Sequence, residues 1–137
     1  MSLEKLITIS PITNEPILTR NGLSEADITA IRSNAADAFK KWKQVDFEER
    51  LKIVKKALTL ILEKEEELAK ELTEQMGRPI AYTPSEIKTA VKRGEYICKI
   101  AADALEDTPG ETEKGFNRFI RKVPVGPVLI IFAWNVS

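Results

Sequence analysis

The stretch Val128-Leu129-Ile130-Ile131-Phe132-Ala133-Trp134 contains no polar residue, and it decides the class of fold. A run that is apolar on both faces is typical of a strand covered on both sides, as parallel strands are inside an α/β sheet. Parallel strands need partner strands that are reached through crossover helices. Only Asn135, Val136 and Ser137 follow in the sequence. The pattern therefore predicts a chain that is cut at the entrance of a larger α/β domain.

A second strand is expected just before this stretch, over Phe116–Val123, where basic residues keep the segment compatible with solvent. Two prolines and a glycine within Pro124–Pro127 predict a turn between the two strands. The expected strands therefore lie near 117–124 and 128–133.

Most of the chain before these strands is expected to be helical. Ser24 is an N-cap candidate for a first helix, and the apolar stripe of that helix ends at Trp42, whose indole is expected to pack in the core. Helical spacing of apolar residues continues to Leu105, with the second and third of four helices either separate or merged.

Local signals mark where these helices begin and end. Gly77 has the residue type of a helix end, and Thr83 followed by Pro84 has the residue types of a helix start, with Thr83 as the cap. Before the first helix, β-branched runs at 6–9 and 17–19, separated by a stretch with Pro11, Asn14 and Pro16, predict a β-hairpin. Asn21-Gly22 then turns the chain.

The composition excludes several kinds of chemistry. The chain has 137 residues with 21 Lys+Arg, 21 Asp+Glu and no His, so the commonest general base and metal ligand is absent. Its one cysteine, Cys98, has no second cysteine to pair with, and its place on the apolar side of a helix predicts a small buried residue rather than a nucleophile. The net charge of zero argues against a nucleic-acid partner.

The sequence predicts neither a membrane-spanning segment nor a phosphate-binding loop for a dinucleotide or a nucleoside triphosphate. The longest apolar run has seven residues, whereas a spanning helix needs about 20. No signal peptide is expected from the first ten residues, and the single cysteine is compatible with the expected cytoplasmic location. The glycines form neither of the familiar phosphate-binding patterns.

Arg121–Gly126, followed by an apolar strand that ends in Trp134-Asn135, forms the most specific motif of the chain. It resembles the segment that opens the cofactor domain in the aldehyde dehydrogenase superfamily, where Trp-Asn is followed by an aromatic residue and Pro. Val136-Ser137 departs from that ending. Weaker matches occur upstream in the family's order and spacing: Ser10–Ile17 (with Glu15 in place of Gly), Ala38–Trp42, Glu49-Arg50, Glu67–Ala69 and Met76–Pro79.

The resemblance implies a parent activity that oxidises aldehydes to carboxylic acids with NAD or NADP. The family's nucleophilic Cys and its general-base Glu lie beyond the part that this chain matches. The chain is therefore expected to be inactive alone and to bind no cofactor alone. One catalytic position carries over, Asn135, whose side-chain amide helps to form the oxyanion hole. The backbone of Phe132, Ala133 and Trp134 matches a stretch that lines the nicotinamide-side ribose, and no metal site is implied.

The expected fold class is mostly α within this chain. Three to four helices, an N-terminal hairpin and two C-terminal strands form a fragment of an α/β aldehyde-dehydrogenase-like fold. Residues 1–137 are expected to form one N-terminal region. Its parts are a hairpin over 1–22, helices over 23–107, an oligomerisation-type strand over 115–125, and the first strand of an incomplete cofactor domain over 127–134.

Two interpretations of function follow. The leading one is the N-terminal part of an aldehyde dehydrogenase, through a frameshift, an unspliced end or an engineered boundary. The alternative is a non-catalytic helical interaction module that associates with a full-length aldehyde dehydrogenase subunit or with itself. Neither interpretation includes a nucleic-acid or membrane partner.

Overall fold

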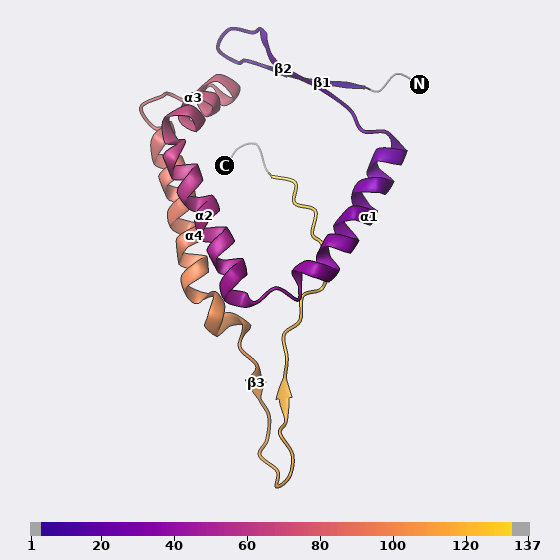
Figure 1. Cartoon of the computed structure of the whole chain (residues 1–137). Coiled ribbons are helices and arrows are strands. Elements are labelled where there is room, and N and C mark those ends of the chain that lie inside the picture. Colours follow the sequence, from indigo (N-terminus) through magenta and orange to yellow (C-terminus); the bar gives the residue numbers. More distant parts are fainter. Residues whose placement is uncertain (1–3, 133–137) are drawn as a thin grey trace.

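Four helices dominate the fold, and three of them pack side by side (Figure 1). The computed structural model describes residues 4–132. In it α2 (Phe47–Glu63), α3 (Glu65–Met76) and α4 (Thr83–Leu105) form a bundle, while α1 (Glu25–Trp42) stands apart from it. The predicted, mostly α architecture is confirmed. The second and third helices are separate elements, divided at Lys64.

The bundle contains the fully buried side chains of the described part. Ala69 of α3 is 1% exposed and Thr83 of α4 is 0% exposed, with Cys98 also buried. Gly94 of α4 lets α2 approach closely, because a Cβ at this position would lie 2.5 Å from Cδ2 of Leu58. The buried state of Cys98 agrees with its prediction as a small core residue.

Two of the predicted helix signals are confirmed, and one is displaced by a residue. The Ser24 hydroxyl accepts the Asp27 N–H at 3.1 Å, and the Asp27 carboxylate accepts the Ser24 N–H at 2.9 Å, which completes a capping box. Gly77 ends α3 with φ 71°, a left-handed conformation that glycine adopts without strain. Thr83 is the first residue of α4 and not its cap, a position taken by Tyr82.

The expectation that Trp42 packs in the core is wrong for the described part of the chain. Its side chain is 41% exposed, and α1 has no buried residue at all. The apolar stripe exists, with Ile28 and Ile31 on it, but both side chains stay about half exposed, and an apolar cavity separates them from residues 127–129. A helix buries such a stripe only where another element supplies the opposing surface.

The predicted N-terminal hairpin is present. β1 (Lys5–Ile9) pairs antiparallel with β2 (Pro16–Asn21), and the register shifts between Thr8 and Ile9. The loop between these strands reaches the bundle, because Pro11 lies beside Gly77 at the end of α3.

The strand predicted over 117–124 is present only as a two-residue strand, and its partner strand at residues 108–109 was not predicted. β3 (Thr108–Pro109) pairs with β4 (Phe119–Ile120) in a hairpin that projects from the end of the bundle (Figure 1). Residues 121–132 form no strand, although strands were expected over 117–124 and 128–133. A strand forms only against a hydrogen-bonding neighbour, and the described residues offer none beside this segment. Residue 133 lies outside the described part.

Candidate functional site

The predicted catalytic and cofactor positions lie at the C-terminal end of the sequence, and Phe132 is the one that the structure describes. Phe132 is 82% exposed. Ala133, Trp134 and Asn135 lie outside the described residues. The arrangement of the predicted site therefore lies outside the described part of the chain.

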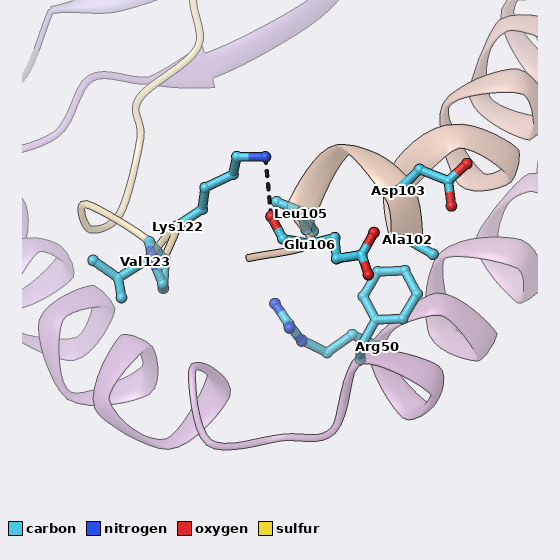
Figure 2. A pocket seen from close by; sticks show the side chains of 9 residues that line it. Arg50, Ala102, Asp103, Leu105, Glu106, Lys122 and Val123 are labelled. Atoms are coloured by element: carbon cyan, nitrogen blue, oxygen red, sulfur yellow. Dashed lines mark hydrogen bonds between the residues drawn. The ribbon is translucent and has the colours of Figure 1, made fainter. Parts of the chain in front are cut away.

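A cavity of about 580 Å³ lies elsewhere, where the start of α2, the end of α4 and the chain after β4 meet (Figure 2). Charged side chains of both signs line it together with apolar ones. The lining residues are Phe47, Arg50, Ala102, Asp103, Leu105, Glu106, Lys122, Val123 and Pro124.

Arg50 enters this cavity from the first turns of α2 (Figure 2). Its Nε is buried and has no hydrogen-bond partner among the described residues. A buried donor without a partner is uncommon and costs about 1–3 kcal/mol. Sequence reasoning included Arg50 only as part of a weak motif, because a pattern of residues does not show which side chain lacks a partner.

Lys122 caps the C-terminal end of α4. Its Nζ donates to the carbonyl oxygens of Ala104 at 3.0 Å and Glu106 at 3.1 Å, one of them drawn in Figure 2. The last carbonyls of a helix have no partner within the helix, and a cation there also interacts favourably with the helix dipole. Sequence reasoning assigned Lys122 to keeping a strand soluble and to the motif over 121–126, and missed this contact.

Arg121 has an equally defined role. Its guanidinium forms a two-point ion pair with Asp107, with Nη2 2.8 Å and Nε 3.1 Å from Oδ2. The hydrogen bond from Arg121 holds the pKa of the Asp107 carboxyl below its usual value. These contacts fix the two ends of the projecting hairpin against the end of α4.

The charged groups around this cavity hold segments of the chain together. Asp103 and Glu106 share the cavity with Arg50 and Lys122, so neither sign of charge dominates it. Cys98 is not among the residues that line the cavity. Between residues 4 and 132 no group of three or more His, Cys, Asp and Glu could hold a metal ion. In the same range no helix is both long and apolar enough to cross a bilayer.

Comparison with known proteins gives a consistent result along the whole sequence. The profile of the aldehyde dehydrogenase family matches residues 1–137. The chain is 30% identical over 128 residues to a succinate-semialdehyde dehydrogenase [NADP(+)] of Deinococcus radiodurans, which covers 93% of this chain and 27% of the relative. It is 32% identical over 114 residues to the mitochondrial succinate-semialdehyde dehydrogenase of rat, a match that covers 83% of this chain and 21% of the relative. The chain thus spans about a quarter of the length of these curated relatives.

Solved structures share the arrangement of the elements described above. HpcC from Thermus thermophilus superposes with a TM-score of 0.86 at 24% identity, over 97% of this chain and 26% of that one. The succinic semialdehyde dehydrogenase of Streptococcus pyogenes, solved with NADP+, gives a TM-score of 0.71 at 25% identity, over 80% of this chain and 24% of that one. The sequence match covers every residue, including the strand motif that carried the resemblance, and the chain therefore belongs to the aldehyde dehydrogenase family.

Proposed function

We propose that this chain forms the N-terminal part of an NAD(P)-dependent aldehyde dehydrogenase, whose complete form oxidises an aldehyde to a carboxylic acid. The observation that carries the proposal is the family match over residues 1–137. It is supported by relatives of known activity that are about four times as long. We place this activity in the cytoplasm, in keeping with a single unpaired, buried cysteine.

In this proposal the chain contributes one group to the chemistry. The amide of Asn135 donates a hydrogen bond to the oxygen that gains negative charge when the aldehyde carbon is attacked. A fixed donor of this kind stabilises the transition state by about 3–4 kcal/mol. The attacking thiolate and the base that activates water come from the part of the family fold that this chain does not span.

The residues present do not by themselves fit a dinucleotide. Phe132, the one described cofactor position, contributes to neither the cavity beside Arg50 nor the apolar one beside α1. We therefore propose that the 137-residue chain alone binds no NAD or NADP and turns over no aldehyde. Purified chain, assayed at 340 nm with either cofactor and succinate semialdehyde, tests this directly.

A chimeric enzyme tests the family function itself. The matched N-terminal region of the D. radiodurans enzyme is replaced by this chain, and the product is assayed with succinate semialdehyde and NADP+. Turnover by the chimera supports the proposal, because the transplanted region must complete the site of the host. A folded chimera that binds NADP+ but oxidises no aldehyde would contradict it.

A second candidate function rests on the exposed apolar segment at 128–132. In this candidate the chain is a non-catalytic module whose terminal strands pair with a full-length aldehyde dehydrogenase subunit. Mixing the chain with the D. radiodurans enzyme and measuring mass by light scattering after size-exclusion chromatography tests it. A complex of defined mass favours the module, whereas two unchanged peaks exclude that partner.

A further inference from the structure

We draw no further inference here: the strongest candidate, the cavity of about 580 Å³ where the start of α2 and the end of α4 meet residues 122–124, carries none, because carboxylates and cations line it together, the unpartnered Nε of Arg50 is itself buried, and nothing in the described residues shows which ligand or partner would fill it.

Discussion

Arg121 forms a two-point ion pair with Asp107, although fourteen positions separate the two residues in sequence. Its Nη2 lies 2.8 Å and its Nε 3.1 Å from the same carboxylate oxygen. One residue directly precedes β3 and the other directly follows β4. The pair therefore closes the base of the projecting hairpin, where the β3–β4 ladder has two residue pairs.

This ion pair predicts a pH dependence of the hairpin. The pKa of Asp107 lies below its ordinary value of 3.8 in the folded chain, chiefly because Arg121 donates hydrogen bonds to the carboxylate. A lowered folded pKa means that the pair stabilises the hairpin fully above the unfolded pKa, and that this contribution is lost as the pH falls through the folded pKa. Titration of the Asp107 carboxyl by NMR should give a value that rises toward 3.8 in Arg121→Ala.

Arg118→Ala is the matched control for that titration. Arg118 lies in the same hairpin and pairs with Glu113 instead. Its removal should leave the pKa of Asp107 where it is in the unchanged chain. Equal values for Asp107 with and without Arg121 would show that the pair does not persist in solution.

A second prediction concerns the contact between α2 and α4 at Gly94. Alanine ordinarily favours a helix over glycine by about 1 kcal/mol. Here the new Cβ would lie 2.5 Å from Cδ2 and 3.0 Å from Cδ1 of Leu58. Overpacking of this kind costs about 1–3 kcal/mol, so Gly94→Ala should lower the free energy of unfolding by up to about 2 kcal/mol.

A double-mutant cycle separates those two effects. Leu58→Ala removes the obstructing methyl groups, so adding Gly94→Ala to it should be neutral or stabilising, as helix propensity alone requires. Urea unfolding of the four variants measures the coupling. Additive changes in unfolding free energy would show that the helices separate slightly at Gly94 without cost.

A third prediction concerns the buried hydroxyl of Thr83. This side chain is 0% exposed, and its Oγ1 donates to the carbonyl of Ile80 at 3.3 Å and lies 3.3 Å from Oγ1 of Thr73. Thr83→Val removes both contacts, while Thr73 Oγ1 keeps its hydrogen bond to the carbonyl of Ala69 at 3.1 Å. The loss of the Thr83 hydroxyl should therefore cost about 0.5–1.5 kcal/mol, the net contribution of a hydrogen bond. Thr89→Val, which removes an exposed hydroxyl from the same helix, should change the unfolding free energy by less than about 0.5 kcal/mol. Equal effects in urea unfolding would contradict a buried role for Thr83.

The helix caps of this fold could be predicted from sequence, whereas the cover of an apolar helix face and the contacts between distant segments could not. Ser24 and Gly77 act on backbone groups within a few residues, so their residue types were enough to predict their roles. Trp42 was predicted to be buried because the stripe of α1 is apolar, but a stripe does not specify what covers it. Lys122 and Arg50 depend on contacts between segments far apart in the chain, which residue patterns do not report.

The stretch from Val128 to Phe132 shows the same difference between local pattern and wider context. Its composition predicted a strand covered on both faces, and its side chains are 64–87% exposed among the described residues. Its predicted strand conformation depended on neighbours that the described residues do not include. An apolar pattern therefore predicts that a segment is to be buried, whereas its strand conformation depends on a neighbouring strand that can pair with its backbone.

The last prediction concerns Asn135 in the chimera with the D. radiodurans enzyme. If its amide stabilises the developing oxyanion, Asn135→Ala should lower kcat by about 10²–10³-fold with a smaller change in KM, because the hydrogen bond strengthens only as the charge develops. Asn117→Ala removes an exposed amide from the hairpin loop and should leave kcat unchanged. Steady-state rates of NADPH formation with succinate semialdehyde measure both. An Asn135→Ala chimera that keeps the kcat of its parent would remove the only catalytic role assigned to this chain, while its family membership would stand on the match over residues 1–137.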